Sequence, residues 1–309
     1  MKAETNLQKI LSQGKFAVTS ECTPPRGTGI DFVHKNAAQL KGKVDAVNVN
    51  DNPTASVRMS SWALSKILLD MGIEPVFQMV TRDRNRIALQ SDLLGASALG
   101  IQNVLCLTGD HQARGDHPQA KKVFDLDSIQ WIMAVKQIRD KGLLMNGKKI
   151  SGAPKFFIGG VANPFVESIE LHIIRLQKKI NEGVDFIQTQ PVLDIEHFKK
   201  WITQATEQGL TDKCPIIAGV MLLKSARIAR YLQNNVPGIM IPDTIIDRLA
   251  AVPEDKQQDE GINICIERIE ELKQIKGVKG VHIMAIGCEE KVAEIVDRAG
   301  LLPRPDVSQ

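Results

Sequence analysis

Aromatic residues are scarce in this sequence of 309 residues: nine Phe, three Trp and one Tyr make up 4% of the chain. Proteins that bind single-stranded nucleic acid usually stack the bases on aromatic rings. They also present a strongly basic surface, whereas here 39 Lys and Arg against 36 Asp and Glu leave a formal charge of only +3. The composition therefore argues against a nucleic-acid-binding protein.

Long apolar runs and paired cysteines are missing too. No stretch approaches the roughly 20 apolar residues that span a bilayer, and the polar N-terminus, MKAETNLQKILSQGK, lacks the apolar part of a secretory signal. The five cysteines are widely spaced and form no CxxC pair, which argues against a disulfide framework and a classical type of zinc site. His111 and His117 share one loop but are a weak metal signal. We expect a cytoplasmic protein without a metal.

What the sequence does contain is an alternation of short β-branched, apolar runs with longer segments of helical period. The predicted strands are 16–25, 45–51, 74–80, 103–110, 155–162, 185–192, 215–222 and 280–287. The predicted helices are 31–41, 60–72, 84–100, 127–141, 166–183, 195–208, 224–235, 259–275 and 289–300, with a small insert at 238–252. There is no GxGxxG, no Walker A sequence and no linker. The pattern favours a single (β/α)8 TIM barrel, with its core at about 16–300 of one domain spanning 1–309, over two doubly wound domains.

In such a barrel the active site lies at the carboxyl ends of the strands. Polar residues expected at these ends are Ser20, Glu21, Asn48, Asn50, Gln78, Thr108, Gly109, Asp110, Asn163, Gln188 and Gln190.

Glu21 is the most informative of these positions. It follows the apolar segment FAVTS and precedes Cys22 and the rigid Pro24-Pro25 pair, so its side chain should point into the barrel mouth. Burial raises the pKa of a carboxyl group, which suits it to general acid catalysis. The alternative is a structural ion pair with a Lys or Arg inside the barrel.

Asp110 and Gln190 are two further candidates. Gly109 would let the backbone before Asp110 approach a ligand, although Asp110 could equally cap the following loop. Gln188 and Gln190 alternate along one strand and should face the same side, with Thr189 facing the other. An amide at Gln190 could bind the polar edge of a heterocycle or simply a neighbouring loop.

Two groups of basic residues also stand out. Three arginines in TRDRNR (81–86) open a helix, where they do not complement the helix dipole; they could bind anions, pair with Asp51 and Asp83, or form a solvated charged run. His172, Arg175 and Lys179 are spaced i, i+3, i+7 and share one helix face. That face could receive phosphates or be an ordinary solvated surface.

Several short motifs together resemble the methylenetetrahydrofolate reductase family of flavin-dependent barrels in one-carbon metabolism. They are SECTPP after the first strand, RDRNR after the third, LTGD at the end of the fourth, GGVANP after the fifth and TQPVLD after the sixth. The resemblance covers about 16–303, and the ending, VHIMAIG followed by AGLLPRP, is similar to the short reductase subunits of acetogen-type bacteria.

The resemblance implies reduction of 5,10-methylenetetrahydrofolate to 5-methyltetrahydrofolate, a step towards methionine biosynthesis, by hydride from N5 of a bound flavin. Glu21 matches the general acid, Asp110 the aspartate near flavin and folate, and Gln190 a glutamine that contacts folate. The implied flavin-binding residues are Asn50, Gln78, Thr108, Gly109, Asp110, Asn163, His172, Arg175 and Lys179. FAD is favoured by the family, and FMN is possible because His172 stands where relatives often carry an acidic residue.

The chain departs from the family pattern in ways that bear on the electron donor. Cys22-Thr23 precede the prolines, Thr108 replaces an arginine, and Pro191-Val192-Leu193 replace aromatic residues after Gln190. Those aromatic residues help to stack a nicotinamide cofactor or the folate ring. We therefore expect electrons either from NAD(P)H or through a partner subunit, in an oligomer. Two other functions stay open: a methyltransferase-type barrel that binds folate or pterin without flavin, and a non-catalytic barrel subunit of a complex.

Overall fold

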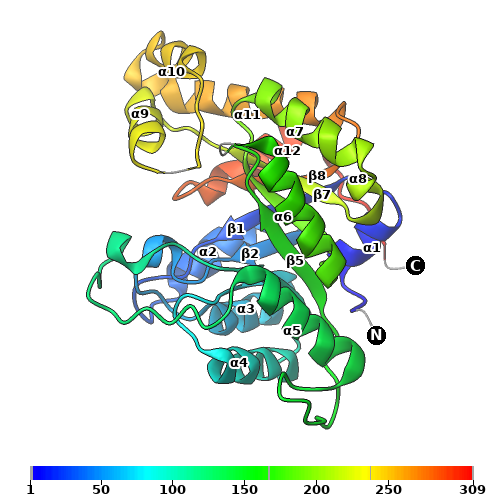
Figure 1. The fold of residues 1–309 in the computed structure, drawn as a ribbon. Helices are drawn as coiled ribbons and strands as arrows, with labels where there is room; N and C mark the ends of the chain where they lie inside the picture. Colours follow the sequence, from blue (N-terminus) through cyan, green and yellow to red (C-terminus); the bar gives the residue numbers. More distant parts are fainter. Residues whose placement is uncertain (1–2, 166–167, 237, 308–309) are drawn as a thin grey trace.

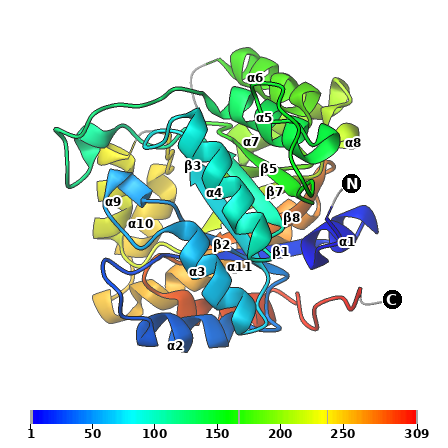
Figure 2. The same ribbon diagram turned by 90° about the horizontal axis from the view of Figure 1, so that it is seen from below.

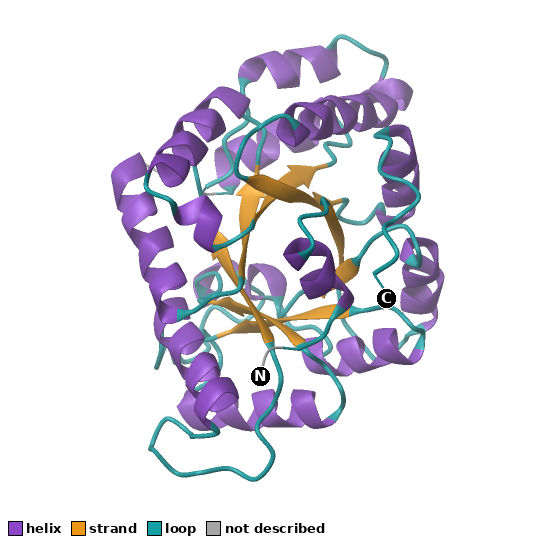
Figure 3. Ribbon diagram, turned by 90° about the vertical axis from the view of Figure 1, so that its right-hand side faces the viewer, coloured by secondary structure: helices purple, strands orange, loops and turns teal. Residues whose placement is uncertain are grey.

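The computed structural model describes residues 3–165, 168–236 and 238–307. Eight parallel strands close into a barrel in the order β1 to β8, and helices surround it (Figures 1 and 3). The strands are β1 (Ala17–Cys22), β2 (Ala46–Val49), β3 (Pro75–Val80), β4 (Asn103–Leu107), β5 (Phe157–Ala162), β6 (Phe186–Pro191), β7 (Ile216–Met221) and β8 (Val278–Met284). The predicted (β/α)8 barrel is confirmed.

The α-helices cover the outside of the barrel, except for the first. They are α1 (Asn6–Ser12), α2 (Asp31–Leu40), α3 (Ser61–Asp70), α4 (Arg86–Ala98), α5 (Ser128–Lys141), α6 (Ile169–Glu182), α7 (Ile195–Glu207), α8 (Leu210–Lys213), α9 (Ala226–Asn235), α10 (Asp243–Ala250), α11 (Gln257–Lys273) and α12 (Val292–Arg298). Short 3₁₀ turns are η1 (Pro53–Ala55), η2 (Gln112–Arg114), η3 (Glu254–Lys256) and η4 (Glu289–Lys291). None of the described helices is long and apolar enough to cross a membrane.

The main hydrophobic core lies between the strands and the helices, where side chains such as Trp131, Phe198 and Trp201 are fully buried. A second cluster fills the barrel at the amino ends of the strands. There Leu7 and Ile10 of α1 pack with Phe157 and Phe186. Helix α1 therefore closes this end of the barrel (Figure 2).

Polar contacts hold this closed end together. Glu74 accepts hydrogen bonds from the backbone amides of Asn6 (2.6 Å) and Leu7 (3.0 Å), at the positive end of α1. Asp45 accepts two hydrogen bonds from the Arg304 guanidinium, at 2.9 and 2.6 Å, and another from the amide of Val18. The C-terminal segment is thus tied to the first two strands.

The structure also differs from the sequence prediction in several boundaries. Helices α1 and α8 were not predicted, since α1 is short and looks polar when its buried partners are unknown. The predicted strand 103–110 ends at Leu107, because Gly109 turns the backbone with φ +90°. The predicted helix 166–183 begins with residues that lie outside the described part of the chain. Within the described residues, helix α6 begins at Ile169. The insert at 238–252 contains α10, which lies beside α9 (Figure 1).

Candidate active site

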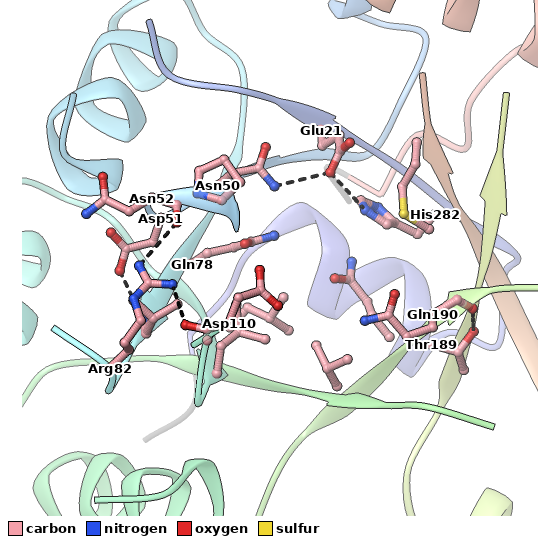
Figure 4. Close-up of a pocket in the computed structure, with 18 residues that line it drawn as sticks. Glu21, Asn50, Asp51, Asn52, Gln78, Arg82, Asp110, Thr189, Gln190 and His282 are labelled. Atoms are coloured by element: carbon pink, nitrogen blue, oxygen red, sulfur yellow. Dashed lines mark hydrogen bonds and ion pairs between the residues drawn. The ribbon is translucent and has the colours of Figure 1, made fainter. Parts of the chain in front are cut away.

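A cavity of about 390 Å³ opens at the carboxyl ends of the strands (Figure 4). Its size is within the range of small-molecule sites. It is lined by Glu21, Asn50, Asp51, Asn52, Pro53, Gln78, Val80, Arg82, Leu105, Leu107, Gly109, Asp110, Val161, Gln188, Thr189, Gln190, His282 and Met284. Polar side chains from β1, β3, β6 and β8 and from the loops after β2, β3 and β4 therefore converge on one space.

Glu21 is buried on one side of this cavity, at 7% exposure. Burial raises the pKa of its carboxyl group to about 7, with nearby Glu289 adding to the rise and a hydrogen bond from Asn50 opposing it. No Lys or Arg among the described residues forms an ion pair with Glu21, so the structural ion pair considered above is not found there. At neutral pH this group can both hold and release a proton, as a general acid must.

Asn50 orients the Glu21 carboxyl group. Its Nδ2 donates to Glu21 Oε2 at 3.2 Å, and its Oδ1 accepts from the hydroxyl of Thr23 at 3.0 Å. Asn50 comes directly after β2, whose register places Asn48 beside Glu21. The loop between Glu21 and the two prolines therefore contributes to the position of the acid through Thr23.

His282 of β8 faces Glu21 from the next strand of the barrel (Figure 4). Its Nε2 lies 4.0 Å from Glu21 Oε2, and its Nδ1 lies 2.9 Å from the Thr19 hydroxyl. Burial lowers the pKa of His282 to about 4, so the ring is neutral at pH 7. The pair is therefore not a salt bridge at neutral pH.

Asp110 lies across the cavity, in the loop after β4. Arg82 fixes this loop, because its Nη1 donates to the Asp110 carbonyl and its Nη2 to the Asn52 carbonyl, both at 3.1 Å. A Cβ at Gly109 would lie 3.0 Å from that of Val80, so a side chain there would be crowded as well as strained. The following turn is capped by His111 and not by Asp110.

The arginine run is structural to a large extent. Arg84 pairs with Asp51 at 2.7 Å and with Asp92 at 2.9 Å, and Arg82 pairs with Asp83 at 2.6 Å. The side chains of Arg82 and Arg84 are only 2% and 14% exposed, so the solvated interpretation is wrong for these two. The predicted pairing with Asp51 and Asp83 is confirmed.

A second cavity of about 220 Å³ adjoins the first and shares Leu107 and Val161 with it. Its lining residues are Cys106, Leu107, Thr108, Ser128, Val161, Ala162, Asn163, His172, Arg175, Leu176 and Lys179. The predicted basic face of α6 therefore turns towards a cavity at the barrel mouth.

Lys179 carries the clearest electrostatic signal in this second cavity. Burial lowers the pKa of its ammonium group to about 8, and the neighbouring Arg175 adds to this effect. Its Nζ donates to the carbonyl of Val161 at 2.5 Å, and neither it nor Arg175 pairs with a carboxylate among the described residues. Two cations held together in this way fit an anionic group such as a phosphate.

The residues to which the family resemblance gives a catalytic or binding role all line one of the two cavities. Glu21, Asn50, Gln78, Gly109, Asp110 and Gln190 line the first, and Thr108, Asn163, His172, Arg175 and Lys179 line the second. Ser20 and Asn48 instead bond within the barrel wall and interior, to the Ile283 carbonyl and to Gln188. Thr189 was expected to face away, but it lines the first cavity because the pairing of β6 with β7 is irregular between Gln188 and Pro191.

The lining residues that the sequence did not indicate include Asn52, Arg82 as a support of the mouth, His282 and Met284. Asn52 has a left-handed backbone, with φ 45°, which no sequence pattern indicated. The available signal for His282 was a single polar residue inside the apolar strand VHIM, one strand away from Glu21 in the closed barrel.

The fold and the site together define the class of protein to which this chain belongs. A parallel (β/α)8 barrel with a carboxyl group titrating near neutrality at its mouth, next to a cationic cavity, is an enzyme scaffold that can combine acid catalysis with the binding of a phosphorylated cofactor. The chain belongs to the methylenetetrahydrofolate reductase family, whose model matches residues 6–300.

Individual relatives agree with this assignment. The chain is 25% identical over 249 residues to a probable methylenetetrahydrofolate reductase (NADPH) of Caenorhabditis elegans, covering 78% of this chain and 35% of the relative. It is 26% identical over 337 residues to methylenetetrahydrofolate reductase (NADH) 1 of Arabidopsis thaliana, covering 100% of this chain and 52% of the relative. The chain therefore spans about half or less of the length of these relatives.

A solved structure is similar in fold. It is an uncharacterized protein from Clostridium thermocellum that binds two copies of 5-methyl-5,6,7,8-tetrahydrofolic acid, with 17% identity and a TM-score of 0.64. The match covers 96% of this chain and 99% of that protein. At this identity the similarity concerns the fold.

Proposed function

We propose that this protein reduces 5,10-methylenetetrahydrofolate to 5-methyltetrahydrofolate in a single barrel domain, with a bound flavin as the immediate reductant. The observation that carries the proposal is Glu21, a buried carboxyl group whose pKa is about 7 in the main cavity of a barrel from this family. The flavin, when bound, supplies a hydride from its N5 atom. The protein supplies the proton, the position and the electrostatic environment.

The proton from Glu21 serves to open the five-membered ring of the substrate. Protonation at N10 breaks the bond between the methylene carbon and N10, and leaves a cation in which that carbon is doubly bonded to N5. Addition of a hydride to this carbon gives the 5-methyl product. One proton and one hydride are consumed, and Glu21 is left as a carboxylate that must regain its proton before the next turnover.

The other lining residues divide between substrate and cofactor. We assign Gln190 and Asp110 to the folate, with Asp110 also close to the flavin ring, since both lie in the cavity of Glu21. Asn50, Gln78, Thr108 and Gly109 are assigned to the flavin ring, and Asn163, His172, Arg175 and Lys179 to the remainder of the cofactor. The two cavities share Leu107 and Val161, and we assign one extended molecule to both.

The choice between FAD and the shorter FMN concerns the residues around the second cavity. His172 is half-buried, and burial together with Arg175 and Lys179 lowers the pKa of its ring. The two cations beside it suit the phosphate that FAD and FMN share, and we propose FAD, which the family favours, with FMN as the shorter alternative. Mass analysis of the flavin released from the purified protein distinguishes the two.

Electron entry is proposed to occur from NAD(P)H or through a partner subunit in an oligomer. The segment after Gln190 is Pro191-Val192-Leu193, and all three side chains are buried, so no exposed aromatic ring follows Gln190. A nicotinamide ring would have little to stack on at this place. Rapid bleaching of the flavin by NADH in stopped-flow mixing, without a partner, would exclude the need for a partner subunit.

The test of the proposed function is a half-reaction. The purified protein is reduced with dithionite and mixed with 5,10-methylenetetrahydrofolate, and reoxidation of the flavin is followed together with formation of 5-methyltetrahydrofolate. We expect stoichiometric product. A colourless protein that binds folate would indicate the methyltransferase-type barrel, and a flavoprotein that is not reoxidised would indicate a non-catalytic subunit.

A further inference from the structure

The most unusual neighbour of the proposed acid is His282. Among the described residues no Lys or Arg forms an ion pair with Glu21, and the group that faces it from β8 is a neutral imidazole at 4.0 Å. His282 is only 4% exposed, and the proposed proton transfer gives it no direct role.

A chain of hydrogen bonds inside the barrel sets the orientation of this ring. Asn48 Nδ2 donates to Gln188 Oε1 at 2.6 Å, and Gln188 Nε2 donates both to Asn48 Oδ1 and to the Thr19 hydroxyl, each at 3.3 Å. The Thr19 oxygen in turn lies 2.9 Å from His282 Nδ1. All four residues are buried and come from different strands, β1, β2, β6 and β8.

This chain assigns the tautomer of His282. Among the hydrogen bonds of the described residues, Thr19 Oγ1 has two partners, and one of them, Gln188 Nε2, can only donate. A buried hydroxyl group keeps an acceptor for its hydrogen, so His282 Nδ1 takes that role. The single N–H of the neutral ring then lies on Nε2, the nitrogen that faces Glu21.

We propose that His282 is a positioning residue for Glu21, whose Nε2–H, oriented by Thr19 and Gln188, stabilises the carboxylate that remains after proton transfer. The inference rests on the proposed function. The distance of 4.0 Å is too long for a hydrogen bond in the protonated state. A small rotation of the Glu21 carboxyl group brings Oε2 into contact when its negative charge develops.

Other charged groups around Glu21 work in the opposite direction or are neutral. Glu289 of η4 disfavours the carboxylate, and Cys22, the next residue, has a pKa raised by burial to about 12 and therefore stays protonated. Asn50 of the β2 loop is the other donor. Asp110 lines the far side of the cavity, and Gln188 and Gln190 carry no charge. His282 and Asn50 are thus the two groups that favour the ionised state.

The test is the pH profile of the half-reaction in wild-type protein and in three variants. His282→Leu removes the donor, His282→Gln keeps an amide N–H at the same reach, and Thr19→Val keeps the ring but removes the group that fixes its tautomer. His34→Leu is the matched control, because His34 is exposed on α2.

In His282→Leu we expect the rate constant for flavin reoxidation to fall roughly 10- to 100-fold, the value of one hydrogen bond to a charged group. The alkaline limb of the profile should move to higher pH, because loss of a donor to the carboxylate raises its pKa. Folate affinity and flavin content should not change. Thr19→Val should move the limb in the same direction by a smaller amount, and His282→Gln should restore both the rate and the limb.

Two results separate failure of the inference from failure of the proposed function. A wild-type protein that does not reduce the folate would refute the function. An active wild type, with the same alkaline limb in His282→Leu and Thr19→Val, would refute the role of His282 even if both variants were slower. If His282→Leu does not fold, Thr19→Val alone decides, since it preserves the ring and the strand volume.

Discussion

Two glutamates at opposite ends of the barrel, Glu74 and Glu21, have different hydrogen-bond surroundings. At the amino ends of the strands, Asp45 and Glu74 each accept three hydrogen bonds, from backbone amides, the Arg304 guanidinium and Asn103. At the carboxyl ends, Glu21 accepts one hydrogen bond, from a neutral amide. The same residue type is therefore fully bonded at one end and left underbonded at the other.

This difference separates stability from chemistry. Burial raises the pKa of both glutamates, but three hydrogen bonds to Glu74 oppose this rise and tie strands and termini together. Glu21 has a single opposing donor, and its pKa of about 7 lets it exchange a proton near neutral pH. The same holds for cations: Arg304 forms a bidentate pair, while Lys179 bonds one carbonyl and has a lowered pKa. Substitutions at the two ends should consequently change different measurements.

The largest effect is expected on turnover at the open end. Glu21→Gln cannot donate the proton to N10, so folate reduction should fall by about 10² to 10⁴-fold, the usual contribution of a general acid. Flavin binding should survive, as measured by the visible absorbance of the purified variant. Glu74→Gln is the control glutamate at the closed end and should lose stability while keeping its rate below the melting temperature. An equal loss of rate in both variants would show that Glu21 has no catalytic role that Glu74 lacks.

The next effect concerns stability at the closed end. Arg304→Ala leaves Asp45 buried without its guanidinium, which typically costs about 3–5 kcal/mol of unfolding free energy. Denaturant unfolding followed by circular dichroism measures this loss. Arg304→Lys keeps the charge but not the two parallel hydrogen bonds. Its unfolding free energy should lie between those of wild type and Arg304→Ala. A loss below about 1 kcal/mol in Arg304→Ala would mean that the pair does not hold the C-terminal segment.

At the open end, replacing the buried carboxyl group of Glu21 should raise the free energy of unfolding instead of lowering it. Because folding raises the pKa of Glu21 from 4.5 to about 7, the ionised side chain destabilises the fold as pH rises through that interval. Below pH 4.5 the Glu21 side chain is protonated in both the folded and the unfolded protein. Its titration should then cause no difference in unfolding free energy between wild type and Glu21→Gln. Above pH 7 the variant should be more stable by about 3 kcal/mol. Urea unfolding of flavin-free protein at both pH values tests this, and a variant less stable at high pH would contradict it.

The smallest effect is expected in the second cavity. Lys179→Met should weaken flavin binding about 10- to 100-fold, since one hydrogen bond to a charged group is lost. Titration of the flavin-free protein measures the change. Lys178→Met is the control from the same helix, because Lys178 is exposed and does not line the cavity. Equal losses in the two variants would indicate only the general charge of α6.

Much of the open end could be predicted from the sequence, because strand period and the βα order fix where each strand ends. Glu21, Asp110 and Gln190 stand at such ends, and the spacing of His172, Arg175 and Lys179 correctly predicted a shared face. His282 could not be chosen in this way, since its partner Thr19 becomes a neighbour only when β8 pairs with β1 and closes the barrel. Helix α1, which closes the amino end of the barrel, was missed because this short helix has only two buried residues, Leu7 and Ile10.

If Glu21 supplies the proton that opens the folate ring, the half-reaction must depend on pH through this carboxyl group. Reduced wild-type protein and Glu21→Gln are each mixed with 5,10-methylenetetrahydrofolate from pH 5 to pH 9, and the rate constant of flavin reoxidation is recorded. We expect the wild-type rate constant to fall as pH rises through about 7, and the variant to be slow at every pH. Reoxidation of Glu21→Gln at the wild-type rate, or a wild-type rate independent of pH across this range, would show that Glu21 is not the proton donor.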